Sequence, residues 1–541
     1  MKVIKLKMRN YIVLLFALAL VFSCTDLEEE LLDSTTGEEL FVQLAEQFEE
    51  DPEAAALSVV GPVYGQLTAF LAQDGIYALQ EHPSDEMLGP TRGTDWDDGG
   101  VWRVLHTHDW DPNHRMVTAA WDGMNVGVAR AFFALETFDL SGVTESLPAF
   151  VAEAKFMRAY YMFHLIDMFG QVPYQDEAGN AIVVERAEAT ALAIQDLREA
   201  IPALPLKADQ EYGRATQGAA KTMLAKYLLN LEVFTGTAAT NAQLQEVITL
   251  ADEVTASGQY AIAEDYFGMF NTDNSANWTS TDEAMIVVEN DEDINRGPSH
   301  SRVMMTTHYN QKYGIDIIAD DPGSPWNGFA TVADFYNRWD ADGNPGNGVE
   351  TNDIRFSDES YIDQIGTNRG FLVGQQFDLS GTALEDRNGN PLIYTPEVSL
   401  TSAAEPEGVR VLKYSPDQDT PTNDQSDTDF VLLRYSDLVL MKAEAQWRLG
   451  QSADAATTIN TIRTVRGATE ITTVSGDGQE VLDERGFELY WEGHRRNDVI
   501  RFGTFNDAYS ERSASDPFTR LFPIPQGALD TNPNLRQNDG Y

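Results

Sequence analysis

The sequence is poor in cysteine and in lysine. Its 541 residues include one cysteine, Cys24, so no disulfide can form within the chain. Ten residues are lysine, and the 37 basic residues face 86 acidic ones. A surface with this balance repels nucleic acid and anionic lipid. We therefore exclude nucleic-acid binding.

Common enzyme motifs are also missing. The sequence has no His-Glu-x-x-His and no Gly-x-Ser-x-Gly, and the segment 218–222 lacks the glycine before lysine that a phosphate-binding loop requires. Glycoside hydrolysis needs only two carboxylates at a fixed separation, so a suitable pair among 86 acidic residues stays open. We expect a non-enzyme without cofactor or catalytic residues, with a surface glycoside hydrolase as the alternative.

The N-terminal hydrophobic run is too short to cross a bilayer as a helix, which takes about 20 residues. Tyr11–Phe22 has 12 residues, follows four basic residues, and is followed by Ser23 and Cys24. This order is typical of a secretory signal peptide. Removal of residues 1–23 leaves 33 basic against 86 acidic residues, a net charge of −53 over 518 residues.

The segment Val21–Cys24 resembles a bacterial lipobox, in which cleavage precedes a cysteine that is then acylated. A reactive thiol would instead require a basic neighbourhood, and Thr25–Glu30 is acidic. Two or more acyl chains give stable membrane anchoring. We therefore predict that Cys24 is a lipid anchor and that residues 24–38 form an acidic tether.

The rest of the chain is rich enough in apolar residues to fold, with 43% hydrophobic and 10% aromatic residues. Phe150, Ala154, Met157, Tyr161 and Leu165 recur at helical spacing, which predicts an amphipathic helix ending before Gly170 and Pro173.

Two pairs of helices are predicted to form antiparallel hairpins. The first starts at Thr216 as N-cap, turns near 235–240 and ends at Gly258; the second runs from 435 to Gly467, with Ser452 capping its second helix. Hairpins of about 34 residues resemble tetratricopeptide units. We predict a mainly α fold: a tetratricopeptide-like helical hairpin scaffold with long loop-rich inserts and a few short strands.

Residues 260–430 are rich in Gly, Asn, Asp and Pro, with a strand expected at 284–288 and a hairpin turn at 386–390. The expected organisation is an N-terminal helical region (39–260), a loop-rich insert region (261–430), and a C-terminal helical hairpin and tail (431–541). We expect the last region to pack with the first as one body. Long loops in a compact protein are often functional.

Several motifs occur along the chain, in the segments 158–161 and 167–173, 213–219 with Asn230, 484–501, 521–525 and 537–541. Each motif alone is modestly specific, but their number and order are together characteristic. They resemble the SusD/RagB family of glycan-binding lipoproteins of Bacteroidetes outer membranes.

The resemblance implies a helical, tetratricopeptide-like fold and a lipid-anchored protein on the extracellular face of the outer membrane. It implies capture of oligosaccharide or polysaccharide and delivery to a partner, a SusC-like, TonB-dependent transporter that the protein covers as a lid. The acidic stretch after Cys24 resembles the signal for export to the outer face. A lid for peptide cargo with little sugar affinity stays open as a further alternative.

A sugar ring presents apolar C–H faces and a rim of hydroxyls, so its site needs aromatic platforms together with polar side chains of fixed geometry. Two loop segments offer this mixture, 84–103 and 309–328, the second also containing Tyr313. For Trp102, packing inside the scaffold is an equally good interpretation. The predicted glycan-binding residues are Arg92, Asp95, Trp96, Trp102, Tyr309, Trp326 and Asn327.

The other conspicuous residues are interpreted as structural. Trp121, Trp447 and Trp491 lie on predicted scaffold helices, and we expect the charged segment 484–501 to form an ion-pair network. Residues 340–351 begin like a calcium-binding loop, but Pro345 stands where glycine is needed and Thr351 where glutamate is needed. We expect a surface turn there.

Four histidines fall in one stretch, and a His-x-His pair can place two imidazoles on the same face of a strand. Their spacing matches no ordered metal motif, so we predict no metal site. They are His82, His106, His108 and His114.

Overall fold

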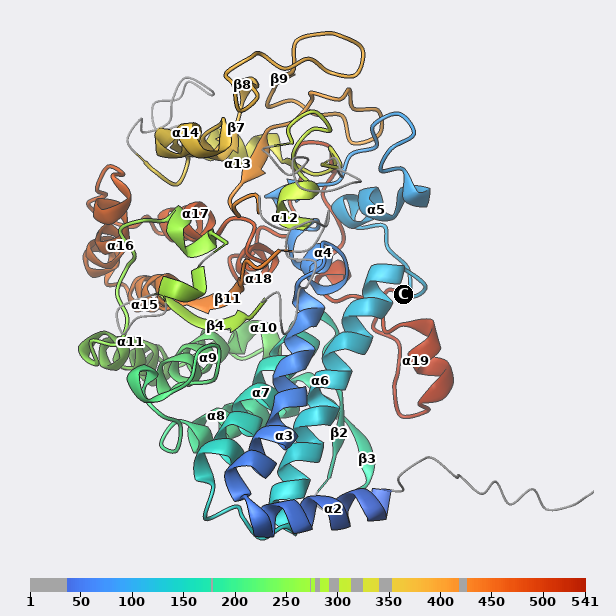
Figure 1. Ribbon diagram of the computed structural model, residues 1–541, viewed down its shortest axis with the longest axis vertical. Helices are drawn as coiled ribbons and strands as arrows, with labels where there is room; N and C mark the ends of the chain where they lie inside the picture. Colours follow the sequence, from blue (N-terminus) through green and yellow to red (C-terminus); the bar gives the residue numbers. More distant parts are fainter. Residues whose placement is uncertain are drawn as a thin grey trace, which may run out of the picture.

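A computed structural model describes residues 37–176, 179–272, 274–277, 283–290, 301–312, 325–339, 353–417 and 426–541. Long helices make up one end of the molecule, and irregular loops with short strands make up the other (Figure 1). The predicted signal peptide, Cys24 and the calcium-like turn 340–351 lie outside the described residues. The first described helix starts at Gly37, one residue before the expected end of the tether at 38.

Helices dominate the chain. They are α2 (Gly37–Glu50), α3 (Pro52–Gly65), α4 (Gly75–Glu81), α5 (Val101–Thr107), α6 (Arg115–Leu140), α7 (Pro148–Met168), α8 (Arg186–Ala200), α9 (Gln217–Leu229), α10 (Leu231–Thr235), α11 (Asn241–Ala256), α12 (Ser301–Met304), α13 (Ala333–Arg338), α14 (Ile362–Ile365), α15 (Tyr435–Arg448), α16 (Ser452–Arg466), α17 (Gln479–Leu489), α18 (Arg495–Arg501) and α19 (Gln526–Thr531).

The strands are short and pair only in small antiparallel sheets, ordered β1-β5, β10-β7-β6, β11-β4, β2-β3 and β8-β9. They are β1 (Met87–Leu88), β2 (Gln171–Gln175), β3 (Ala181–Glu185), β4 (Ala284–Val288), β5 (Ala330–Thr331), β6 (Ser357–Asp358), β7 (Arg369–Leu372), β8 (Gly374–Gln375), β9 (Ile393–Tyr394), β10 (Arg410–Leu412) and β11 (Phe430–Arg434). The predicted mainly α fold with long loop-rich segments and few short strands is confirmed.

Helices α3, α6 and α7 pack side by side in the helical end of the molecule (Figure 1). Their close approach depends on Gly127, because a Cβ there would lie 2.5 Å from the Tyr161 ring. The Tyr161 hydroxyl then donates to the Val63 carbonyl at 2.6 Å. The predicted helix around 150–168 is confirmed as α7, which ends two residues before Gly170.

Both predicted hairpins are present, with α9 packed on α11 and α15 packed on α16. The Thr216 hydroxyl caps α9 by accepting from the Ala219 amide at 3.1 Å, as predicted. Ser452 is not the cap residue, because it is the first helical residue of α16. The cap position falls one residue earlier, on Gln451.

The predicted strand at 284–288 is confirmed as β4, and it pairs with β11, which leads directly into α15. The predicted turn at 386–390 is also present, because the Asp386 amide donates to the Asn390 carbonyl at 2.7 Å. The division into three regions stays a prediction.

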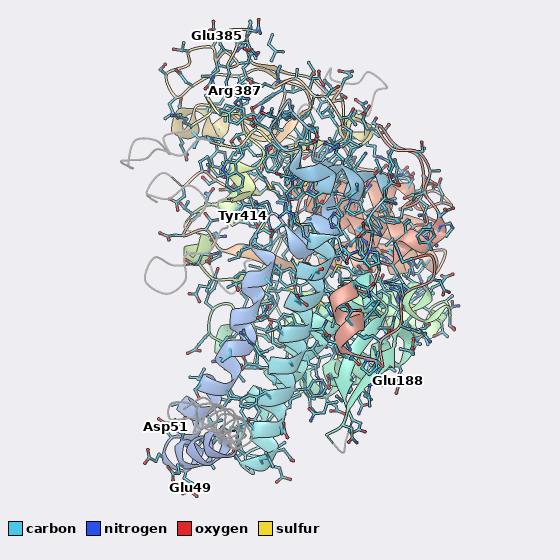
Figure 2. All side chains as sticks on the ribbon, turned by 90° about the vertical axis from the view of Figure 1, so that its right-hand side faces the viewer. Glu49, Asp51, Glu188, Glu385, Arg387 and Tyr414 are labelled. Carbon is cyan, nitrogen blue, oxygen red and sulfur yellow. The ribbon has the colours of Figure 1, made fainter. Side chains whose placement is uncertain are left out.

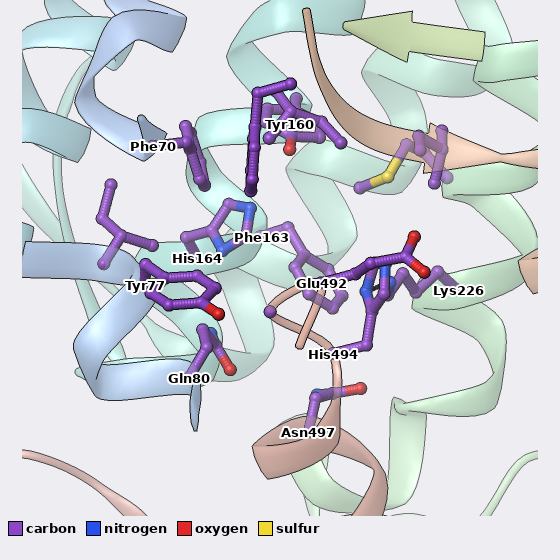
Figure 3. A pocket seen from close by; sticks show the side chains of 16 residues that line it. Phe70, Tyr77, Gln80, Tyr160, Phe163, His164, Lys226, Glu492, His494 and Asn497 are labelled. Atoms are coloured by element: carbon purple, nitrogen blue, oxygen red, sulfur yellow. Dashed lines mark hydrogen bonds between the residues drawn. The ribbon is translucent and has the colours of Figure 1, made fainter. Parts of the chain in front are cut away.

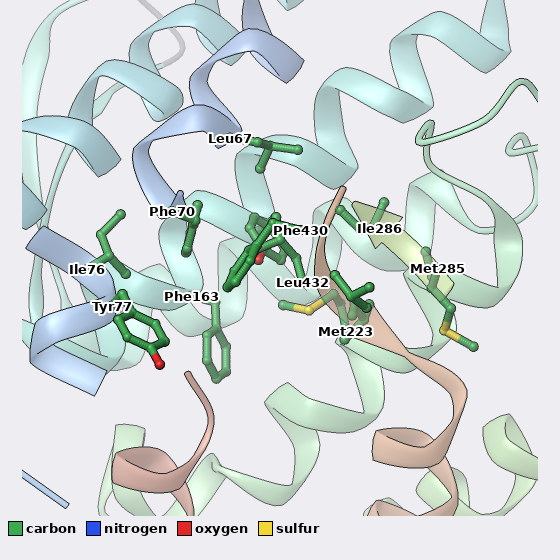
Figure 4. Packing of buried hydrophobic residues seen from close by; sticks show 14 of the residues in the cluster. Leu67, Phe70, Ile76, Tyr77, Phe163, Met223, Met285, Ile286, Phe430 and Leu432 are labelled. Carbon is green, nitrogen blue, oxygen red and sulfur yellow. The ribbon is translucent and has the colours of Figure 1, made fainter. Parts of the chain in front are cut away.

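The core joins segments that are far apart in sequence. Figure 4 shows Phe70, Tyr77 and Phe163 from the helices beside Phe430 and Leu432, which belong to β11. All five side chains are buried. Because β11 lies in the main core, it anchors the C-terminal end of the loop-rich region 261–430 to the helical body.

The charged segment 484–501 forms the expected ion-pair network, and it is buried. The Glu488 carboxylate accepts from Arg434 at 2.7 Å, from Arg466 at 2.8 Å and from Arg355 at 3.1 Å. Arg434 also pairs with Glu283 at 3.0 Å, a contact that ties β11 and α17 to β4. Burial alone raises the pKa of Glu488, but Arg466 and Arg434 hold it well below its ordinary value.

The three tryptophans interpreted as structural are packed. Trp121 and Trp491 are buried, and Trp447 stacks on Phe502 with ring centroids 5.5 Å apart. Within the described part of the chain no single helix is long and apolar enough to cross a membrane. One bent pair, 52–70 with 75–81, meets the length and composition criteria, and its second helix, α4, is wholly buried.

Loss of one partner from the buried network should destabilise the fold strongly. We predict that Arg434→Met lowers the free energy of unfolding by about 3–5 kcal/mol, because Glu283, Glu488 and Glu492 stay buried with one cation fewer. Urea denaturation measures this change. As control, Lys442→Met breaks an exposed pair with Asp252 and should cost about 1 kcal/mol or less. Equal shifts for the two variants would contradict this account.

Candidate functional site

Three parts of the chain that are distant in sequence meet at the loop-rich end of the molecule: 91–103, 305–312 with 325–329, and 385–410. The buried Arg92 guanidinium donates to the Gly328 carbonyl at 3.2 Å and to the Ala404 carbonyl at 2.6 Å. The buried Arg410 donates to the Asn327 side chain at 3.0 Å and to the Glu405 carbonyl at 3.0 Å. Two arginines therefore hold the three segments together.

Neither of these arginines forms an ion pair with a carboxylate among the described residues. Burial lowers the pKa of Arg92 well below its ordinary value, and the neighbouring Arg410 lowers it further. Burial likewise lowers the pKa of Arg410 to about 10. Hydrogen bonds from a guanidinium to carbonyls are strong when the donor is charged.

An aromatic cluster lies on this junction. Trp96 packs between Phe329, Trp102 and Trp326, with ring centroids 4.8, 5.7 and 6.5 Å away. Phe329 and Trp102 are buried, whereas Trp96 and Trp326 are partly exposed. The Trp96 indole donates to the Trp326 carbonyl at 2.7 Å, which fixes the ring. The outer layer of the cluster is therefore accessible aromatic surface on a rigid base.

The backbone around this cluster is strained. Six non-glycine residues in the described part of the chain have positive φ, and three belong to the site: Trp96 at 59°, Asp98 at 40° and Asn327 at 49°. Such conformations cost about 1–3 kcal/mol each and persist where the surroundings enforce them, often at ligand-binding sites. The strain is consistent with a site that holds an aromatic ring in one position.

A polar rim borders the aromatic surface. The Tyr309 hydroxyl donates to Asp95 at 2.6 Å, and Arg387 donates to Asp95 at 2.9 Å and to Glu405 at 2.6 Å. The Arg387 guanidinium also lies over the Tyr309 ring, 4.0 Å from its centroid. Figure 2 shows Arg387 and Glu385 at the end of the molecule opposite Glu49 and Asp51.

The rim carboxylates are held in the charged form. The Tyr309 hydroxyl, and then Arg387, lower the pKa of Asp95. Burial raises the pKa of Glu405, but the Arg387 amide and the His308 and Arg387 side chains bring it below its ordinary value. Burial and Asp95 raise the pKa of Tyr309, so its hydroxyl keeps its proton. The rim presents oriented donors and acceptors, as hydroxyl recognition requires.

The structure brings all seven predicted site residues into one neighbourhood but divides their roles. Asp95, Trp96, Tyr309 and Trp326 have accessible surface. Trp102 is 2% exposed and bonded to Asp98, so the expectation of an open indole face there is wrong. Arg92 and Asn327 are buried, 3% and 0% exposed, because they tie the loops together, and they cannot bind ligand hydroxyls directly. Tyr313 lies outside the described residues.

Sequence reasoning missed Arg387 and Glu405, which complete the rim. The turn 386–390 was recognised, but no pattern in the sequence placed its arginine beside Asp95, 292 positions away. The only available signal was an arginine at the tip of a polar turn inside a loop-rich segment.

The four histidines for which we predicted no metal site are all buried. His106, His108 and His114 each hydrogen-bond a backbone carbonyl at 2.9–3.0 Å, and His82 packs on Phe329. Among the residues that the structure describes, no group of three or more His, Cys, Asp or Glu side chains is placed to hold a metal ion.

An internal cavity lies elsewhere, between the helices and the C-terminal segment (Figure 3). Its lining includes Tyr77, His164, Lys226 and His494, and its volume is about 30 Å³. This is room for one or two water molecules and not for a sugar ring. The cavity is therefore a feature of packing.

Two family models match the chain. The SusD family model matches residues 283–541, and a model described as starch-binding associating with outer membrane matches residues 61–229. The chain is also similar to the starch-binding protein SusD of Bacteroides thetaiotaomicron, with 25% identity over 498 residues, 86% of this chain and 85% of that protein.

Solved structures share the fold. A SusD superfamily protein from Parabacteroides distasonis superposes with a TM-score of 0.68 at 20% identity, over 91% of this chain and 99% of that one. A laminarin-binding SusD-like protein gives a TM-score of 0.65 at 21% identity, over 90% and 99% of the two chains.

The position of the Trp96 ring can be tested through the backbone beneath it. A Cβ on Gly328 would lie 2.3 Å from the Trp96 ring and 2.8 Å from the Met305 carbonyl. We predict that Gly328→Ala displaces the indole, changes the near-ultraviolet circular dichroism and lowers the free energy of unfolding by about 1–3 kcal/mol.

Gly65→Ala serves as control, because no atom outside the local backbone lies within 4 Å of a Cβ there and the residue belongs to α3. Alanine should leave the near-ultraviolet spectrum unchanged at this position and stabilise the helix slightly. An unaltered spectrum for Gly328→Ala would show that the indole does not lie across this glycine.

Proposed function

Because the chain belongs to the SusD/RagB family, we propose that it binds an oligosaccharide at the cell surface and delivers it to a SusC-like, TonB-dependent transporter. Binding breaks no bond. The family model for residues 61–229 is described as starch-binding and associated with the outer membrane, and the named relatives bind starch and laminarin.

The observation that carries the proposal is the pairing of accessible indole surface with a rigid polar rim. Trp96 and Trp326 offer apolar faces to the C–H side of a sugar ring, and Asp95, Tyr309 and Arg387 offer acceptors and donors to its hydroxyls. Side chains already fixed by one another lose little conformational entropy when a ligand binds. The site is therefore suited to non-covalent capture.

The position of the site also favours a surface role. Twelve residues lie between Cys24 and the start of α2 at Gly37, a tether that spans at most about 45 Å. Arg387 lies at the end of the molecule opposite Glu49, which belongs to α2 (Figure 2). A lipid on Cys24 would hold the α2 end at the outer membrane and leave the site facing the medium.

The glycoside hydrolase alternative receives less support. Two carboxylates of the polar rim, Asp95 and Glu405, lie beside the aromatic surface, and Arg387 binds both. A glycosidase acid must hold its proton near neutral pH, which requires a raised pKa. The pKa of each of these carboxyls is instead lowered, so neither is suited to protonate a leaving group.

Removal of the exposed indole should weaken glycan binding. We predict that Trp96→Ala raises the Kd for a bound oligosaccharide by about fivefold or more, near 1 kcal/mol, the scale of one lost stacking contact. Affinity electrophoresis of residues 25–541 against a glycan panel, followed by calorimetry, measures the change. An unchanged Kd would remove Trp96 from the site.

Two further measurements distinguish the proposed function from its alternatives. Trp96→Phe keeps a flat ring and should retain most of the affinity, which distinguishes lost stacking from damage to the fold. New reducing ends in the same gels would indicate the hydrolase. Absence of retardation by every glycan would leave the peptide-cargo lid.

The anchor can be tested separately. We predict that Cys24→Ser abolishes labelling by radioactive palmitate and moves the protein from the membrane fraction to the soluble fraction, since acyl chains supply the membrane affinity. Glycan binding by the soluble protein should be unaffected. Retention of Cys24→Ser in the membrane fraction would contradict lipid anchoring at this residue.

A further inference from the structure

A second concave surface, the arginine cleft, lies away from the aromatic site. It has a volume of about 900 Å³ and shares no lining residue with the aromatic cluster or its rim. In Figure 1 its contributors α10 and α18 lie in the middle of the molecule, below α5. We define it by Arg186, Arg448, Arg501, Phe518, Arg520 and Arg536.

The charge of this cleft is opposite to that of the chain. Five arginines line it against three carboxylates, Glu185, Glu232 and Asp539, in a protein whose acidic residues outnumber basic ones 86 to 37. The cleft lining is therefore richer in arginine than in carboxylates, within a chain whose net charge is strongly negative. A long polyanion, a nucleic acid or an anionic membrane would meet repulsion beyond the cleft, whereas a short anion would not.

Two of the five guanidiniums have no carboxylate ion-pair partner within the described residues. Arg186 donates only to backbone carbonyls, at 2.9 Å to Ile166 and 2.7 Å to Val233. Arg520 is exposed and uses its Nε on the Asn506 side chain at 2.8 Å, which leaves its two terminal nitrogens for a ligand.

The remaining arginines are fixed in place. Arg448 and Arg501 both pair with the buried Glu444 behind the wall, at 2.5 and 2.7 Å, and Arg536 pairs with Glu185 at the exposed edge at 2.7 Å. Burial lowers the pKa of Arg186 to about 10, although Asp167 opposes the shift, and burial also lowers the pKa of Arg448, although Glu444 opposes it. An added anion would favour the charged form of both guanidiniums.

An aromatic ring lies beside the cations. Phe518 is 38% exposed, packs edge-on against Tyr541 at 5.1 Å, and lies so close to Gly540 that a Cβ there would be 2.4 Å from the ring. The ring is thus an exposed platform in a fixed orientation. An aromatic face next to guanidinium forks matches a sugar ring that carries an anionic substituent.

We propose that the arginine cleft is a second binding site, which takes a short acidic saccharide by its sulfate or carboxylate group. Sulfate esters and uronate carboxylates both present pairs of oxygens that a guanidinium can bind through two parallel hydrogen bonds. The cleft volume is within the range of small-ligand sites. A polymer with both neutral and acidic residues could occupy both sites and gain avidity.

The test uses three probes on the full mature chain: a sulfated galactotriose, trigalacturonate and neutral galactotriose. Calorimetry should detect binding of at least one anionic probe to this cleft. Added salt should weaken that binding. The neutral probe should bind the cleft more weakly than the anionic one. Arg520→Ala should weaken that binding by about tenfold, and Arg520→Lys by less, since lysine keeps the charge but not the fork.

Matched variants separate this site from the aromatic one. Arg198→Ala removes the same charge from an exposed pair with Glu246 and should leave binding unchanged. Trp96→Ala should also leave the anionic probe bound, even if the proposed function fails. Absence of binding by both anionic probes, or equal weakening by Arg198→Ala and Arg520→Ala, would overturn the proposal.

Discussion

The candidate glycan site depends on two buried arginines that bind loop backbone instead of carboxylates. Arg92 and Arg410 donate to the carbonyls of residues 328, 404, 405, 407 and 408 and to the side chain of Asn327. A guanidinium offers five donors in a fixed plane, so one side chain can satisfy several buried carbonyls at once. Three loops with little regular structure thereby become a rigid base for the aromatic layer and its rim.

Buried arginines join distant segments elsewhere in the protein as well, which accounts for the excess of arginine over lysine. The chain has 27 arginines and 10 lysines. Eight arginines are among its largest fully buried side chains, and they join elements that are distant in sequence. Buried carboxylates such as Glu488 have partners, whereas most of the acidic excess is left for the surface. The interior arginines act as cross-links, and the surface acids set the net charge.

Much of the fold could be predicted from the sequence, because helical periodicity is local. The helix at 148–168, the Thr216 cap, strand 284–288 and the pair of Asp498 with Arg501 all follow from residue types at short spacing. The prediction of Ser452 as the cap is wrong by one residue, because the ends of a helix depend on hydrogen bonds that the spacing of residue types does not reveal.

The site was only half predictable for a related reason. Aromatic and polar residues in a glycine-rich loop identified the right neighbourhood, but not which of them face solvent. Trp102 and Trp96 have similar sequence contexts, yet the first is buried under Phe329 and the second is partly exposed. Arg387 and Glu405 join the rim through contacts across the fold, which no local pattern encodes.

The position of a bound oligosaccharide tests the central claim most directly. A crystal structure of residues 25–541 with a glycan identified by the panel should place a sugar ring against Trp96 or Trp326, with its hydroxyls bonded to Asp95, Tyr309 or Arg387. A glycan bound elsewhere, with these side chains untouched and hydrated, would contradict the account.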